Sequence, residues 1–298
     1  MNKKWFLLFG LIFLSTQLIA QEDLFKLLEK DSLRVHLPIL STFNGSRIIN
    51  VQSNETVKGK NLDFRVSHLF GNVGKKSGGG VHNLFGLDQS QDIRLGFQYG
   101  INNKLTVGIG RSKRFENLDG MIKYKLLQQT TDRQIPVSIS LYSNMTYSTQ
   151  SGAVIEKDLY RFTYCTELIF ARKFNSHFSM VVVPSFLHRN FVIYYEQNKT
   201  FALSSGFRWK FTPSSSIIVD YSHTFNVDQS RRKTYDVLGA GVEIETGGHV
   251  FSIMFSNASG LLENDFLVNT TDNWSDGGFK LSFIISRVFR MDKQKKKV

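Results

Sequence analysis

The sequence has almost no cysteine, little proline and, after its first twenty residues, no long hydrophobic run. Cys165 is the single cysteine among 298 residues, which excludes a disulfide framework, an iron–sulfur cluster and a cysteine-based zinc site. Beyond residue 20 no run approaches the roughly 18 apolar residues of a transmembrane helix. Aromatic residues make up 13% of the chain, however, and hydrophobic residues 41%. This composition excludes a disordered chain and leaves a protein whose apolar residues face either a core or lipid.

The first twenty residues have the layout of a secretory signal peptide. Lys3 and Lys4 precede an unbroken run of apolar residues and glycine at 5–14, and Leu18-Ile19-Ala20 ends the segment. The run is too short to span a bilayer, which takes about 20 residues. The sequence therefore predicts export after cleavage behind Ala20.

The formal charge of +12 would by itself suggest nucleic acid, an anionic surface or an anionic solute as partner. Removal of Lys3 and Lys4 with the signal peptide lowers it to +10. Because an exported protein does not meet nuclear or cytosolic nucleic acid, no nucleic-acid partner is expected.

Four segments follow from the pattern along the chain. Residues 1–20 are the signal peptide, and 21–60 are expected to form a periplasmic N-terminal segment with a short helix at Glu22–Lys30. Residues 61–290 carry the alternating pattern of β-strands. Residues 291–298 form a basic C-terminal tail.

From residue 61 onward apolar and polar residues alternate with period two. Leu62, Phe64 and Val66, for example, alternate with Asp63 and Arg65. Twelve such segments are present, with ten or fourteen as alternatives, and most have the length of the roughly 9–11-residue strands that cross a bilayer. The sequence therefore predicts an all-β fold, an antiparallel transmembrane β-barrel of about 12 strands.

The connections alternate in length. Short connections are expected at 102–104, 129–134, 175–176, 212–215 and 247–248, and longer ones at 71–90, 112–117, 148–158, 193–199, 226–233 and 257–277. Short periplasmic turns and longer extracellular loops are the layout of a bacterial outer-membrane barrel, which predicts that both termini lie in the periplasm.

A soluble barrel also alternates, but with its apolar face inward. Charges of both signs on the polar face, its many Gly and Ser residues, and aromatics near strand ends favour an apolar face turned to lipid. The charged residues expected to face the lumen are Asp63, Arg65, Arg94, Lys123, Lys125, Arg161, Glu167, Arg208, Lys210, Asp220, Glu243, Glu245 and Lys280. Their net positive charge fits either a mild anion preference or a closed, salt-bridged interior.

Several sequence blocks stand out along the chain: Phe43–Asn50 with Glu55-Thr56, Phe64–His68, Asn83–Asp88, Ile93–Gly96, Leu105–Ser112, Phe170–Phe174, Glu245–Phe251, Ser256–Gly260 and Ile285–Phe289. Together these blocks resemble a family of outer-membrane-type β-barrels of unknown function from Bacteroidota, domain of unknown function 5777. The similarity extends over about residues 41–290. It implies an outer-membrane location but no catalytic residues. Outer-membrane barrels often end on an aromatic residue that the barrel-assembly machinery recognises, whereas here Phe289 is followed by a basic tail.

Motifs for catalysis, cofactors or metals are weak. The seven histidines are scattered without a metal-binding pair, and no cofactor is expected. A lipid hydrolase would have to use His249, Ser252, Ser256 and Asn257, but His249 and Ser252 are spaced to lie on opposite faces of a strand. The glycine-rich loop 71–80 lacks phosphate-loop spacing, and Asp272 and Asp276 lack that of an EF-hand.

The leading functional hypothesis is therefore a non-enzymatic outer-membrane protein, a narrow passive channel for small solutes. The alternative is a plugged structural or interaction barrel that uses loops 71–90 and 257–277, and a lipid hydrolase ranks third. The expected partners are outer-membrane lipid, barrel-assembly machinery and small solutes.

Overall fold

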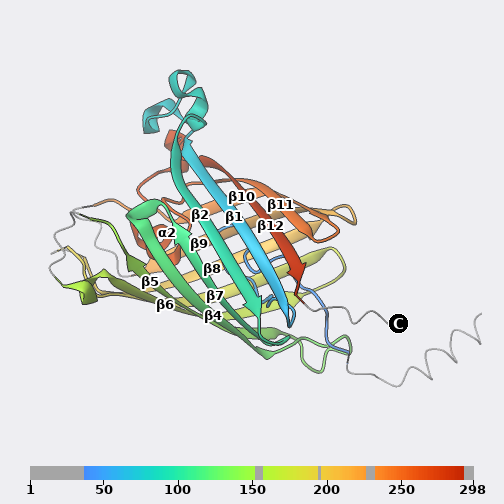
Figure 1. Ribbon diagram of the computed structural model, residues 1–298. Coiled ribbons are helices and arrows are strands. Elements are labelled where there is room, and N and C mark those ends of the chain that lie inside the picture. The colour runs from blue at the N-terminus through green and yellow to red at the C-terminus, as the bar shows by residue number, and fades with distance from the viewer. Residues whose placement is uncertain (1–36, 152–156, 194–195, 226–231, 292–298) are drawn as a thin grey trace, which may run out of the picture.

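The chain forms a closed antiparallel β-barrel (Figure 1). This computed structural model describes residues 37–151, 157–193, 196–225 and 232–291. The described part contains twelve strands: β1 Asn61–Asn72, β2 Ser90–Gly100, β3 Leu105–Ser112, β4 Asn117–Leu127, β5 Ser138–Ser148, β6 Phe162–Lys173, β7 Phe178–Arg189, β8 Lys199–Lys210, β9 Ser215–Phe225, β10 Val237–Thr246, β11 His249–Ser256 and β12 Lys280–Arg290. The predicted fold class and strand number are confirmed.

Each strand pairs with its neighbours in sequence, and β1 closes the ring by pairing with β12. The closing register places Leu62 opposite Phe289 and Phe64 opposite Arg287. Closure leaves no strand edge with unpaired amide and carbonyl groups. In hydrocarbon, where water cannot satisfy such groups, this is a requirement for a β-structure that spans the bilayer.

The two faces of the sheet differ as the alternation predicts. On β4 the outward side chains of Leu118, Ile122 and Tyr124 are exposed, whereas Asp119 and Lys123 on the inner face are buried. The apolar face therefore points outward, contrary to the soluble-barrel alternative. Among the described residues, none of the helices has the length and hydrophobicity needed to cross a membrane.

Short turns and long loops gather at opposite ends of the barrel. At the short-turn end, Gly247 and Gly248 connect β10 to β11 with φ values of 51° and 110°, which glycine adopts without strain. At the other end the β1–β2 connection, with the 3-10 helices η1 (Lys75–Ser77) and η2 (Val81–Gly86), projects well beyond the barrel wall (Figure 1).

Four further short helices lie in the long connections. They are the 3-10 helices η3 (Arg114–Glu116), η4 (Asp158–Arg161) and η5 (Trp274–Asp276), and the α-helix α2 (Glu263–Asn269) between β11 and β12. Of these, α2 turns into the barrel, and it has five buried residues.

The N-terminal segment contributes to the interior of the barrel. Residues 21–60 are expected to form a periplasmic segment ahead of the barrel, and much of the described part, 37–60, folds into the barrel lumen. Alternation could not predict this, because the segment has no strand pattern of its own and is ordered by contacts with the wall. The predicted signal peptide, the helix at Glu22–Lys30 and the tail from 292 onward lie outside the described residues.

Candidate functional site

Residues 42–57, which we call the plug, form a compact irregular insert in the lumen. A small hairpin is closed by the Ile48 amide donating to the Val51 carbonyl at 2.9 Å and the Ser53 amide donating to the Ser46 carbonyl at 3.0 Å. Phe43, Ile48, Ile49 and Val51 are buried against apolar side chains of the inner wall. Burial of these residues and internal hydrogen bonds together allow a segment without regular structure to order.

Asp220 on β9 fixes the tip of the plug hairpin. Its carboxylate accepts the backbone amides of Asn50 at 2.5 Å and Val51 at 2.8 Å. The Asn50 side chain in turn donates to the Ser256 hydroxyl at 3.1 Å. A buried carboxylate is stabilised by such backbone donors, and the donors are satisfied in return.

Lys123 on β4 holds the other side of the hairpin. Its ammonium group donates to the Ser46 carbonyl at 2.8 Å, the Gln52 side-chain oxygen at 2.9 Å and the Ser53 carbonyl at 3.0 Å. The three donors of an ammonium are thereby all used. The Lys123 side chain is fully buried, so oxygen atoms of the plug take the place of water in solvating its ammonium group.

The opposite end of the lumen is filled by residues 257–270, which we call the loop insert. Phe266, Leu267 and Val268 of α2 belong to a buried apolar cluster with wall residues, Cys165 and Leu187 among them. The described long connection after β11 is thus a second core element, folded inward, and not a solvated loop.

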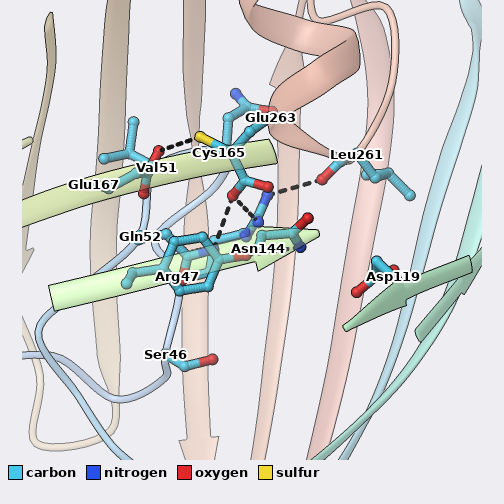
Figure 2. A network of polar contacts seen from close by, with 12 residues as sticks. Ser46, Arg47, Val51, Gln52, Asp119, Asn144, Cys165, Glu167, Leu261 and Glu263 are labelled. Carbon is cyan, nitrogen blue, oxygen red and sulfur yellow. Dashed lines mark hydrogen bonds and ion pairs between the residues drawn. The ribbon is translucent and has the colours of Figure 1, made fainter. Parts of the chain in front are cut away.

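The plug and the loop insert meet at a buried ion pair, which we call the latch. Arg47 of the plug pairs with Glu263 of α2, and their side chains are 13% and 2% exposed. Arg47 also donates to the Leu261 carbonyl at 2.8 Å, and Gln52 donates to the same Glu263 oxygen at 2.9 Å. Figure 2 shows these groups converging between the inner wall strands. The latch connects the two inserts through the middle of the barrel.

Little open space remains around the latch. A cavity of about 20 Å³ lies beside Arg47 and Tyr142, enough for about one water molecule since a water needs about 10–15 Å³. A larger hollow of about 350 Å³ lies between the plug and the wall at the short-turn end and includes Glu55 and Asp63. The plug separates this hollow from the latch region.

The structure places most of the predicted lumen residues on the inner face. Buried or nearly buried there are Asp63, Arg65, Arg94, Lys123, Lys125, Glu167, Arg208, Asp220, Glu243 and Lys280. Several make ion pairs: Arg65 with Asp63 at 3.3 Å, Arg94 with Asp119 at 2.5 Å and Lys280 with Asp272 at 2.5 Å. These pairs, with the plug, give the interior the closed, salt-bridged character that was one of the two interpretations of its charge.

Three predicted residues lie elsewhere. Arg161 belongs to η4 before β6, where it bonds the Ser148 and Gln150 carbonyls, so it is a loop residue and not a lumen residue. Lys210 and Glu245 have inner-face parity but lie at strand ends, half-exposed and exposed respectively. The error for Arg161 is one of strand boundary, because period two continues by chance into the preceding turn.

Sequence reasoning missed the residues of the inserts themselves, above all Arg47, Gln52 and Glu263. Arg47 lies in the block 43–50 that resembles the β-barrel family, and this was the one signal that the segment matters. Glu263 lies in a connection between strands, where apolar and polar residues do not alternate. Neither periodicity nor spacing indicates that two loops from opposite ends will meet.

The hydrolase residues are not assembled. His249 stacks on Phe251 of the outer face, whereas Ser252 is buried on the inner face. The Ser256 hydroxyl is bonded to the plug, and the Asn257 side chain donates to the carbonyls of Asp236 and Asp272. Within the described ranges no group of three or more His, Cys, Asp or Glu residues is arranged to hold a metal ion.

Asp265 of α2 is a buried carboxyl group outside the membrane-spanning strands. Burial raises its pKa to about 8, although the nearby Arg114 of η3 opposes the shift, and Asp92 and Glu263 add to it. Arg114 is 3.5 Å away, and among the described residues neither carboxyl oxygen of Asp265 accepts a hydrogen bond. The group is therefore largely protonated near neutral pH when α2 is docked.

Docking of α2 is consequently expected to weaken as pH rises. The carboxyl has a pKa near 3.8 in an undocked loop and about 8 in the docked state, so the docked state binds the proton more tightly. Its stabilising contribution is full below about pH 4 and is lost as pH rises towards about 8. Hydrogen exchange of the 263–269 amides, corrected for intrinsic rates and compared at about pH 5 and about pH 9, should show lower protection at the higher pH. In Asp265→Asn the difference should disappear; an unchanged pH dependence would contradict the assignment.

The comparison with family models gives one match. A model described as a membrane-bound β-barrel domain, domain of unknown function 5777, matches residues 43–289. It extends over the plug from Phe43, the loop insert and the barrel up to Phe289, and it confirms the family that the sequence blocks resemble. No curated protein matches the chain.

Solved porin structures match the chain at low similarity. NanC porin matches at 9% identity with a TM-score of 0.46, covering 76% of this chain and 98% of that one. KdgM porin matches at 8% identity with a TM-score of 0.45, covering 77% and 98% respectively. OmpF of Salmonella typhi matches at 9% identity and a TM-score of 0.35, covering 77% and 97%. At these values the likeness carries no information about function.

Proposed function

Because this chain belongs to a family of membrane-bound β-barrel domains, we propose that it is an outer-membrane barrel closed by its own plug and loop insert. In this proposal the protein works as a structural or recognition element through its exterior loops. The asymmetry of short turns and long loops supports the outer-membrane location, with the long loops outside. One observation carries the proposal: the plug and the loop insert meet at a buried ion pair in the lumen.

The filled lumen argues against free passage of solutes in this state. A continuous water path would require breaking the contacts of Lys123 and Asp220 with the plug and separating the latch. A narrow passive channel, the function favoured by the strand pattern, would therefore need the inserts to leave the lumen first.

The projecting β1–β2 connection offers a surface for recognition. Val81, Leu84, Phe85 and Leu87 are all exposed near its tip, the most exposed being Val81 at 80%. Leu84 and Phe85 have φ values of 49° and 55°, a left-handed conformation that is unfavourable for such residues and is found most often at functional sites. Exposed apolar groups held this way fit contact with another protein.

Planar-bilayer recording of the refolded protein tests the closed state. The wild-type protein is expected to show no steady conductance. A variant that lacks residues 21–60 and has 261–270 replaced by a short Gly/Ser linker should conduct, because the plug and the α2 part of the loop insert are gone. Deletion of residues 21–36 alone leaves the described plug in place and serves as the control.

Heat-modifiable gel migration of each variant reports whether the barrel itself is folded. Steady conductance of the wild-type protein would overturn the closed-barrel proposal and restore the passive channel. A photo-crosslinker at Val81 tests the recognition role: it should trap a specific partner in intact cells, whereas the same group at Val288, at the other end of the barrel, should not.

A further inference from the structure

The outer wall over β2–β5 contains a hollow that an ideal apolar barrel surface would not have. Its volume is about 560 Å³, and its outward lining includes Phe97, Ile109, Leu118 and Met145. Hollows of about 300–1,000 Å³ are the size range of small-ligand sites. Ile109 is 68% exposed at its edge, the most exposed of the apolar strand residues on this wall.

Gly120 creates the hollow. Strand pairing places it in one outward row with Ile109 on β3 and Met145 on β5. A Cβ built on Gly120 would meet nothing within 4 Å, and the φ angle is not in the left-handed region, so turn geometry does not demand glycine there. The missing side chain leaves a gap between Leu118 and Ile122, which precede and follow it on the same face.

A cation lies at the end of the hollow that is nearer the long loops. In the next outward row, Arg111 on β3 pairs in register with Leu118, and Leu118 pairs with Tyr147. Tyrosine marks the depth at which a barrel meets lipid headgroups. The Arg111 side chain is 44% exposed, and its Nη1 donates to the carbonyls of Ser112 at 2.7 Å and Asn117 at 3.5 Å. Its Nη2 makes a loose contact of 3.9 Å with the Glu116 carboxylate, so this nitrogen can turn to a phosphate. Lys113, two residues on, is also exposed, so this edge carries more positive than negative charge.

We propose that this groove binds the phosphorylated acyl glycolipid lipid A, with an acyl chain over Gly120 and a phosphate at Arg111. The choice of lipid depends on the proposed outer-membrane location, because lipid A belongs to the exterior leaflet, on the side of the long loops. A guanidinium group pairs with phosphate through charge-assisted, often bidentate, hydrogen bonds. The apolar hollow accommodates the acyl chain of the lipid, and the Arg111 guanidinium group selects the phosphorylated headgroup.

A second hollow on the outer wall is apolar, but its described lining contains no cation. It measures about 380 Å³ and lies over β11 and β12, where it is lined by Phe251, Ile253 and Phe283 among others. It has no charged lining residue among those described. It can accommodate a hydrocarbon chain but provides nothing to distinguish one headgroup from another.

Native mass spectrometry of the detergent-solubilised, full mature protein with added lipid A tests the proposal. We expect Gly120→Leu, which fills open space and should not disturb folding, to reduce lipid A binding by about tenfold or more. Arg111→Ala should cause a loss of similar size. Phosphatidylglycerol, which is anionic but lacks the glycolipid headgroup, should bind more weakly to the wild-type protein.

Two variants elsewhere on the outer wall are matched controls. Ala240→Leu adds a leucine to the outward row of β10, and Arg287→Ala removes an exposed arginine from the other end of the wall; neither should change lipid A binding. Equal binding to the wild-type protein and Gly120→Leu would overturn the site, and preference for phosphatidylglycerol would overturn the choice of lipid. Bilayer recording is independent of both outcomes, so failure of this site and failure of the closed-barrel proposal are distinguishable.

Discussion

Replacing Glu263 by alanine is expected to destabilise the closed protein by about 3–5 kcal/mol, the usual cost of removing one partner from a buried ion pair. Arg47 would keep its charge in the lumen without the carboxylate, and Gln52 would lose an acceptor. Denaturant unfolding in detergent measures the loss. Faster hydrogen exchange in both the plug and the loop insert should accompany it, because each is held by the other.

The double variant Arg47→Met/Glu263→Leu separates the ion pair from simple packing. Replacing both members of a buried pair by apolar groups of similar volume is often nearly neutral, so most of the stability should return. If the double variant loses as much stability as Arg47→Met and Glu263→Leu lose in sum when made singly, the two residues do not act as a pair and the latch is contradicted.

Lys123→Met is expected to have the second large effect. Methionine fills a similar volume but leaves the Ser53 carbonyl and the Gln52 side-chain oxygen without their Lys123 donor, whereas the Ser46 carbonyl keeps the Ser53 amide. Each buried acceptor left unsatisfied costs about 1–3 kcal/mol, so the two together are expected to cost at least about 2 kcal/mol. The measurement is again denaturant unfolding, with limited proteolysis to report release of the plug.

Lys104→Met is the matched control, because Lys104 is exposed in the β2–β3 turn. Surface substitutions of this kind change stability by less than about 0.5 kcal/mol. Equal stability of Lys123→Met and Lys104→Met would mean that the plug is held by apolar packing alone.

These expectations share a physical basis. The lumen contains charged side chains that the barrel strands alone would leave in water or unpaired. The plug supplies backbone oxygens to Lys123 and backbone amides to Asp220, and the loop insert supplies a carboxylate to Arg47. A contact made outside by the long loops is therefore connected, through Glu263, to a segment that faces the opposite end of the barrel.

Local pattern predicted the wall of this protein well. The alternation at Leu62–Val66 recurs around the whole ring, and the order of short and long connections follows from the same pattern. Period two has a direct physical cause, since successive side chains of a strand point to opposite faces. The tight turn at Gly247 and Gly248 could be predicted equally well, because such a turn needs the positive φ angles that glycine adopts. The inward position of Lys123 and Asp220 could be predicted from their alternation with apolar residues along the strand.

The contents of the lumen could not be predicted in this way. Arg47 and Glu263 are separated by more than two hundred residues, and neither lies in a periodic segment. Their pairing depends on the diameter of the closed ring and on which loops turn inward. Likewise the hollow at Gly120 exists only because the register brings Ile109 and Met145 to its sides.

By itself, then, the sequence determined an antiparallel barrel with an apolar outer face, since alternation is a property of each strand and needs no partner to be recognised. Only the tertiary structure decided that the lumen of this barrel is filled. Polar groups inside a ring must find partners, and which segment supplies them depends on distances across the lumen that no local pattern encodes. The plug, the loop insert and the latch between them are the result of that requirement.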